Sequence, residues 1–102
     1  MLMKDERFFK TIKNFLEIYL LKQKNYSKNT QKSYRESLSL LLQYFKEELG
    51  LGYAQIGFDD LTYTNVCGFL DWLTVSRECS PQTVNLRLMA IRSFAKYSSI
   101  VD

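Results

Sequence analysis

The sequence predicts an all-α domain whose four helices form two helical hairpins. Apolar residues recur at helical spacing in four stretches, and one proline and four glycines in 102 residues supply too few turns for an all-β fold. The chain also repeats itself: Ser27-Lys28-Asn29-Thr30 and Ser80-Pro81-Gln82-Thr83 begin 53 residues apart, and each follows an apolar segment. With 46% hydrophobic residues the chain can bury a core, so we expect one domain over residues 1–102.

The first hairpin is predicted over residues 5–49. A helix over about 5–24 carries an apolar stripe formed by Phe8, Ile12, Phe15, Leu16, Tyr19 and Leu20. Ser27 is a favourable N-cap for a second helix that runs to about Leu49, where Gly50 ends it. The inward positions of this second helix are Tyr34, Leu38, Leu41, Leu42 and Phe45.

The second hairpin follows an irregular connection over residues 50–61. Thr62 caps a helix predicted over residues 63–77, with Val66, Phe69, Leu70 and Leu73 inward. Ser80 caps the last helix, and Pro81 takes its first position, where a missing N–H costs nothing. The inner stripe of this helix is predicted to be Val84, Leu88, Ile91 and Ala95, with Phe94 beside it.

Basic residues are segregated along the chain. Residues 22–35 hold five and residues 79–101 hold three, with no acidic residue in either segment, while the remainder carries 6 basic and 11 acidic residues. Such segregation suits a surface that faces phosphates. A helix N-terminus adds unpaired N–H groups and a positive dipole end. The two segments therefore suggest a nucleic-acid surface.

The side chains at the two capped helix starts fit that interpretation. Amide, hydroxyl and basic groups are the ones that reach base edges and backbone in a major groove. They flank the first start as Lys28, Asn29 and Lys32, and the second as Gln82, Asn85 and Arg87. A Ser-x-x-Thr opening is equally explained by helix stabilisation alone, so the caps by themselves leave both interpretations open.

The sequence offers no candidate catalytic residue, metal site or cofactor site. It contains no histidine, which removes Ser/His and Cys/His nucleophile arrangements and most zinc sites. It also lacks the glycine-rich phosphate-binding loops. With two isolated cysteines, no signal-peptide pattern and no apolar run of roughly 20 residues, we expect a cytoplasmic protein outside the membrane.

Three segments resemble the core-binding domain of tyrosine recombinases, the phage-integrase family. Residues Tyr26–Leu38 are similar to that family's S-x-N-T-x-x-x-Y-x-x-x-L opening, and Ser80–Tyr97 to its S-P-x-T-[IV]-N-x-R-L helix. Between them, Leu61-Thr62 and Phe69–Leu73 match the family's L-T and F-L-x-W-L elements. The three segments occur in the family's order and spacing across nearly the whole chain.

The resemblance implies a SAM-like fold of two orthogonally packed hairpins that grips duplex DNA beside the strand-exchange site. It implies a separate C-terminal catalytic domain, absent from this chain, and sister recombinase protomers as further partners. The family's catalytic set needs histidine, so none of the seven tyrosines is expected to be the nucleophile. The motifs and the basic residues that flank them imply the following DNA-facing residues: Ser27, Lys28, Asn29, Thr30, Lys32, Ser33, Ser80, Gln82, Thr83, Asn85, Arg87 and Arg92.

Two other functions remain open from the sequence. A helix-turn-helix transcription regulator would use Ser80–Tyr97 as its recognition helix and would need a dimer on spaced half-sites. A SAM-like protein-interaction domain would bind a protein partner and ignore duplex DNA.

Overall fold

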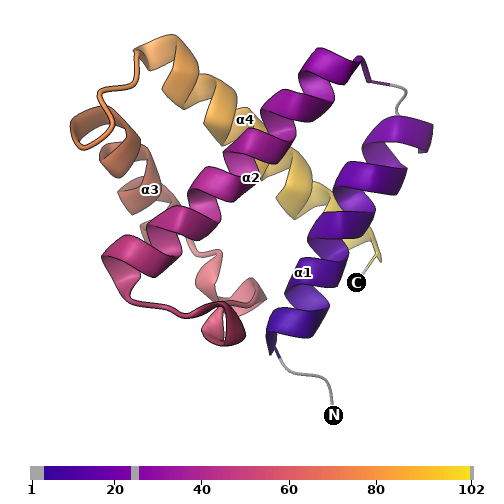
Figure 1. The fold of residues 1–102 in the computed structure, drawn as a ribbon, viewed down its shortest axis with the longest axis horizontal. Helices are drawn as coiled ribbons and strands as arrows, with labels where there is room; N and C mark the ends of the chain where they lie inside the picture. The colour runs from indigo at the N-terminus through magenta and orange to yellow at the C-terminus, as the bar shows by residue number, and fades with distance from the viewer. Residues whose placement is uncertain (1–3, 24–25, 102) are drawn as a thin grey trace.

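The computed structural model describes residues 4–23 and 26–101 of the chain. Helix α1 (Lys4–Asn14) continues into the π-helical segment η1 (Phe15–Gln23), and α2 (Lys28–Leu49) returns alongside it. Two short 3₁₀ turns, η2 (Tyr53–Gln55) and η3 (Phe58–Asp60), lead to α3 (Tyr63–Val75) and α4 (Pro81–Val101). The two hairpins pack so that α2 lies across α4 (Figure 1).

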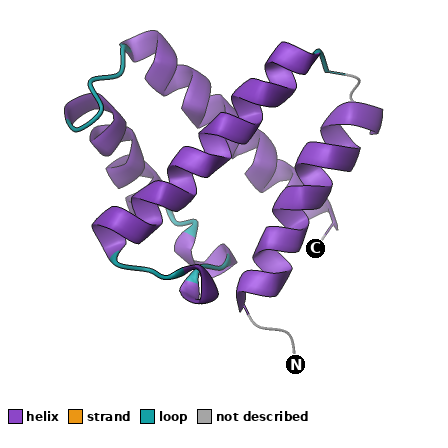
Figure 2. Ribbon diagram, in the orientation of Figure 1, coloured by secondary structure: helices purple, strands orange, loops and turns teal. Residues whose placement is uncertain are grey.

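The described residues contain helices and loops and no strand (Figure 2), which confirms the all-α prediction. The predicted first helix corresponds to α1 and η1 together, except that Lys24 lies outside the described residues. Helix α2 ends as predicted at Gly50, whose φ of 67° is left-handed and whose N–H bonds to the carbonyl of Phe45. Glycine adopts this conformation without a steric penalty, which explains the stop.

The third helix is shorter than predicted. It ends at Val75 and not at Arg77, because Ser76 and Arg77 both donate their N–H groups to the carbonyl of Trp72. Glu78 then adopts a positive φ of 53°, and the N–H of Cys79 bonds back to the carbonyl of Leu73. The chain thus makes a left-handed stop without glycine, which the residue pattern does not signal.

A largely aromatic core joins the two hairpins. The rings of Phe8, Phe15, Phe45, Phe69 and Phe94 are completely buried. Phe94 of α4 makes edge-on contacts with Phe8 and Phe15 of the first hairpin, with ring centroids 5.9 and 5.4 Å apart. Aromatic pairs in this geometry stabilise beyond the area they bury, so this cluster fixes α4 against the first hairpin.

The predicted inner stripe of α4 is partly wrong. Ala95 is exposed, whereas Ala90 is completely buried together with Ile91 and Phe94. The helix is turned toward the first hairpin because Phe94, its largest apolar side chain, fills the core. The stripe that includes Ala95 instead borders α3, where Ala95 and Leu88 line an open apolar groove.

Candidate nucleic-acid interface

Helix α2 begins with a cap of the predicted kind. Ser27 has extended backbone angles, and its Oγ accepts a hydrogen bond from the N–H of Thr30 at 3.2 Å. The same hydroxyl donates to Oγ1 of Thr30 at 3.0 Å. The side chain of Gln31 also donates to the carbonyl of Tyr26, at 2.8 Å, and so ties the preceding residue to the helix. These local bonds fix the first turn of α2 in one conformation.

Helix α4 begins in the same way. The Oγ of Ser80 accepts a hydrogen bond from the N–H of Thr83 at 3.2 Å and donates to its Oγ1 at 3.1 Å. The predicted caps at Ser27, Thr62 and Ser80 are all confirmed, since Thr62 likewise accepts from the N–H of Asn65. The sequence echo between the two hairpins therefore corresponds to a repeated local structure.

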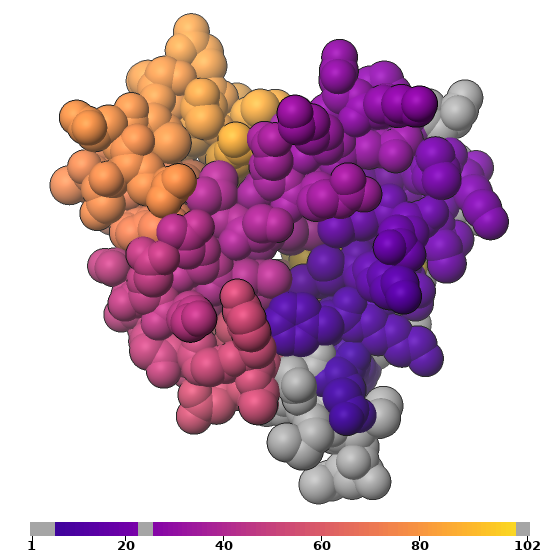
Figure 3. All heavy atoms as spheres, viewed as in Figure 1, coloured from indigo at the N-terminus to yellow at the C-terminus, as the bar shows by residue number. Residues whose placement is uncertain are grey.

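The first turns of α2 and α4 lie at the same edge of the domain, uppermost in Figure 1. The space-filling view shows the outline dipping between them (Figure 3). Below this edge the helices touch where Arg87 meets Ser33. Each contact residue lies five or six positions into its helix, so both starts are within about 9 Å of the contact along the helix axis. Both helices therefore diverge from this contact toward their N-termini.

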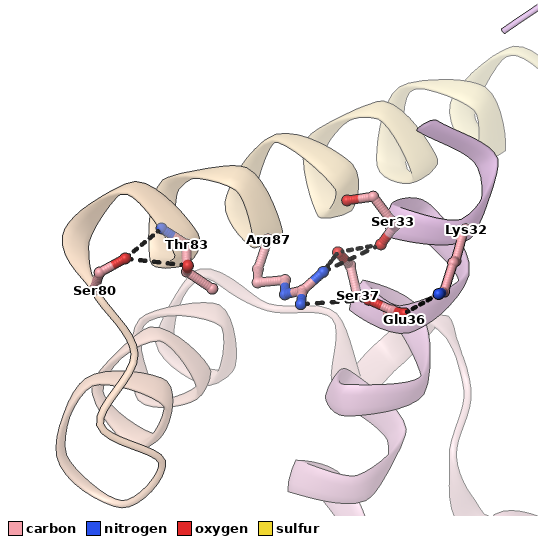
Figure 4. A network of polar contacts seen from close by, with 7 residues as sticks. All are labelled: Lys32, Ser33, Glu36, Ser37, Ser80, Thr83 and Arg87. Atoms are coloured by element: carbon pink, nitrogen blue, oxygen red, sulfur yellow. Dashed lines mark hydrogen bonds and ion pairs between the residues drawn. The ribbon is translucent and has the colours of Figure 1, made fainter. Parts of the chain in front are cut away.

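Arg87 makes the contact between the two helices (Figure 4). Its Nη1 donates to the carbonyl of Ser33 at 3.3 Å and to Oγ of Ser37 at 3.2 Å. Its Nη2 lies 3.7 Å from a carboxylate oxygen of Glu36, and the side chain is only 14% exposed. Glu36 also approaches Nζ of Lys32, at 4.0 Å. One guanidinium thus binds three residues of α2 from α4.

The predicted DNA-facing residues divide by exposure. Those exposed to solvent are Ser27, Lys28, Asn29, Lys32, Ser80, Gln82, Asn85 and Arg92. Those half-buried are Thr30, Ser33, Thr83 and Arg87. The first turns lie at one edge of the domain, on either side of the Arg87 contact (Figure 1), whereas Arg92 lies about 16 Å further along α4 than Pro81. The guanidinium of Arg87 points toward α2, so this side chain links the helices.

The chain matches the profile of the phage integrase N-terminal SAM-like domain over residues 12–99. It belongs to that family. It is similar to two proteins of Sinorhizobium fredii strain NBRC 101917 / NGR234 that are named integrase/recombinase y4rC and y4rD. Identity is 30% over 88 residues for the first and 31% over 91 for the second, covering 86% and 89% of this chain. No solved structure matches it significantly.

This integrase N-terminal domain spans 26% and 32% of the lengths of those two relatives. The matched family describes the N-terminal, non-catalytic part of an integrase. Among the described residues, no three or more Cys, Asp or Glu side chains are placed to hold a metal ion. Over the same residues, no helix combines the length and the hydrophobicity needed to span a bilayer.

Sequence reasoning missed two residues of the interface. Glu36 pairs with Lys32, and its spacing of four residues from that lysine could have predicted the ion pair. Ser37 is completely buried, donates to the carbonyl of Ser33 at 2.8 Å and accepts from Arg87. No local signal predicts the bonds from Arg87, because they join residues 50 or more positions apart.

Three basic residues away from this edge lie over aromatic rings. The guanidinium groups of Arg7 and Arg77 lie over the rings of Phe58 and Trp72, at 5.7 and 5.3 Å from the ring centroids. Nζ of Lys46, near the C-terminal end of α2, lies 5.4 Å from the ring centroid of Tyr53. Lys28 and Lys32, by contrast, extend into solvent from the first turns of α2.

Proposed function

We propose that this SAM-like domain binds duplex DNA with the first turns of α2 and α4, as the DNA-binding module of a site-specific tyrosine recombinase. The observation that carries the proposal is the placement of two identically capped helix starts at one edge, joined by Arg87. Each start offers a positive dipole end to a phosphate, together with first-turn N–H groups that have no acceptor within the helix. These are the N–H groups of Lys28 and Asn29 in α2 and that of Gln82 in α4, since Pro81 has none and the N–H of Thr83 bonds to Ser80. Two such starts on one rigid edge can engage one duplex together.

Charge at this edge supports the proposal. Lys28 and Lys32 are exposed, and residues 27–35 and 79–101 contain no acidic residue. Binding through such a surface releases counterions from DNA, which supplies affinity for any sequence. The exposed amides of Asn29, Gln82 and Asn85 add groups able to hydrogen-bond base edges in a major groove.

Two kinds of contribution follow from the exposure of the side chains. We assign phosphate and base contacts to the exposed residues of the first turns and to the caps. We assign Ser33 and Arg87 to holding α2 against α4, because Nη1 of Arg87 donates to the carbonyl of Ser33 and the arginine side chain is only 14% exposed. Arg92 would extend the surface along α4 toward its C-terminal half.

The strand-cutting chemistry is proposed to lie in a C-terminal catalytic domain of a longer recombinase. The support is that this chain spans only about a quarter to a third of each curated relative. On DNA, the domain would then work with that catalytic domain and with sister protomers in integration or recombination. Sequencing the source gene in frame beyond Asp102 tests this part: a His-x-x-Arg motif and a later tyrosine support it, and a stop codon contradicts it.

The DNA-binding proposal is tested by fluorescence anisotropy with a labelled 30-base-pair duplex of mixed sequence at 50–200 mM NaCl. We expect log K to fall linearly with log salt concentration. Lys32→Ala should weaken binding and reduce the steepness of that slope by about 0.9, the value for one lost phosphate contact. Lys46→Ala is the matched control, since it removes the same charge about 21 Å away on the same helix.

Three results would count against the proposal. Equal effects of the two lysine variants would place DNA elsewhere on the molecule. Absence of duplex binding at low salt would favour a protein-interaction domain. Binding only as a dimer on paired half-sites would favour a helix-turn-helix regulator.

A further inference from the structure

Glu36 is the single acidic residue in residues 27–46 and 79–101, which together form most of α2 and all of α4. Its carboxylate lies at the contact between the two helices, 3.7 Å from Nη2 of Arg87 and 4.0 Å from Nζ of Lys32 (Figure 4). The carboxylate thus lies between two cations and below two helix N-termini, which is where a DNA phosphate would also be attracted.

Glu36 is not needed to place Arg87. The guanidinium is held by two hydrogen bonds from Nη1, to the carbonyl of Ser33 and to the hydroxyl of Ser37. The carboxylate contacts the other terminal nitrogen, at a distance that is long for a hydrogen bond. Loss of the negative charge would therefore leave Arg87 in contact with α2 and leave Nη2 without its ion-pair partner.

The carboxylate is also easily displaced. The side chain of Glu36 is 49% exposed and that of Lys32 is 74% exposed, so solvent and salt screen their attraction. An exposed pair of this kind contributes little to stability, whereas a phosphate that displaces the carboxylate would gain both cations at once. The pair with Lys32 thus adds little to the stability of the fold, and the carboxylate stands where a phosphate would be attracted.

We propose that Glu36 acts as an intramolecular competitor for DNA phosphate at the edge formed by α2 and α4. It occupies Lys32 and Arg87 in the free domain and so limits the number of phosphates that the surface neutralises. This inference rests on the proposed DNA-binding function and adds to it a residue that weakens binding.

The test compares Glu36→Gln with wild type in the same anisotropy assay. We expect tighter binding and a slope steeper by about 0.9, as for one additional phosphate contact. The advantage of the variant should then shrink about 3.5-fold between 50 and 200 mM salt. Glu47→Gln is the matched control: it gives the same net charge from an exposed position about 16 Å further along α2, and should leave the slope unchanged.

Thermal unfolding of each variant, followed by circular dichroism, separates binding from folding. A purely structural Glu36 would make both the melting temperature and the DNA affinity of Glu36→Gln fall. A competitor makes affinity rise, whether or not the melting temperature falls. Glu36→Ser serves as a second variant if Glu36→Gln does not fold, because the serine side chain is neutral and too short to reach Lys32.

The outcomes distinguish the two proposals. Salt-dependent binding by wild type that Glu36→Gln leaves unchanged or weakens overturns the competitor and leaves the proposed function standing. A gain matched by Glu47→Gln also overturns it, because the effect would then be one of net charge. No binding by any variant at low salt means that the proposed function itself has failed.

Discussion

Gly68 lies in the middle of α3 at the point where that helix meets α2. A β-carbon at this position would overlap the hydroxyl of Tyr44 and lie 3.3 Å from its Cζ. Tyr44 is only 7% exposed and is surrounded by Phe45, Phe69 and Trp72, with ring centroids 5.7–6.0 Å away. Moving the tyrosine ring aside would disturb its packing against these three rings, so we expect Gly68→Ala to destabilise the domain.

The size of the effect follows from two opposing terms. Alanine in place of glycine improves helix propensity by about 1 kcal/mol. Forcing a methyl group into a packed contact costs about 1–3 kcal/mol. The net loss should be about 1 kcal/mol, which lowers the melting temperature of a domain of this size by about 5 °C.

Urea and thermal unfolding of a double-mutant cycle with Tyr44→Phe would measure the contact. Removing the hydroxyl removes the closest overlap, so Gly68→Ala in the Tyr44→Phe background should be neutral or stabilising by up to about 1 kcal/mol. A rise in melting temperature for Gly68→Ala in the wild-type background would refute the reasoning. Additive effects of the two substitutions would refute it as well.

Two further predictions concern the caps and alkaline pH. Ser80→Ala and Thr62→Ala should each lower the free energy of unfolding by about 1 kcal/mol, yet only Ser80→Ala should weaken DNA binding, as unfolding and anisotropy assays would show. Burial raises the pKa of Tyr44, and the charges of Glu48 and Asp71 raise it further. Because the folded state disfavours the tyrosinate, the contribution of Tyr44 to stability should be fully present below the unfolded pKa of about 10 and should be lost as the pH rises through the raised folded value. Denaturant unfolding of wild type and Tyr44→Phe between pH 9 and 11 would measure this loss, which should be smaller in the variant.

The sequence predicts features of this fold that depend on neighbouring residues. The caps at Ser27, Thr62 and Ser80 bond to groups three positions along, so a short motif contains all of their atoms. The apolar stripe of the first helix identified Phe8, Phe15 and Leu20 as core because one face of a helix is buried.

The features that sequence patterns missed depend on contacts distant in the chain. Helix α4 packs against both α2 and α3, which widens its buried face. Whether Ala90 or Ala95 is buried therefore depends on how the helices pack, and the residue pattern of α4 alone does not decide it. Nothing in the residue pattern of Phe15–Gln23 predicts the wider π-helical turns. The bonds of Arg87 arise only when the two hairpins meet, so a residue expected on the DNA surface is found half-buried between helices.

The central claim is that DNA contacts the first turns of α2 and α4. Titration of a ¹⁵N-labelled domain with a mixed-sequence duplex, followed through backbone amide chemical shifts, tests it most directly. The account predicts the largest changes over residues 27–33 and 80–87, fading as salt is raised. Changes centred instead on α1, on residues 53–60 or on α3 would contradict it.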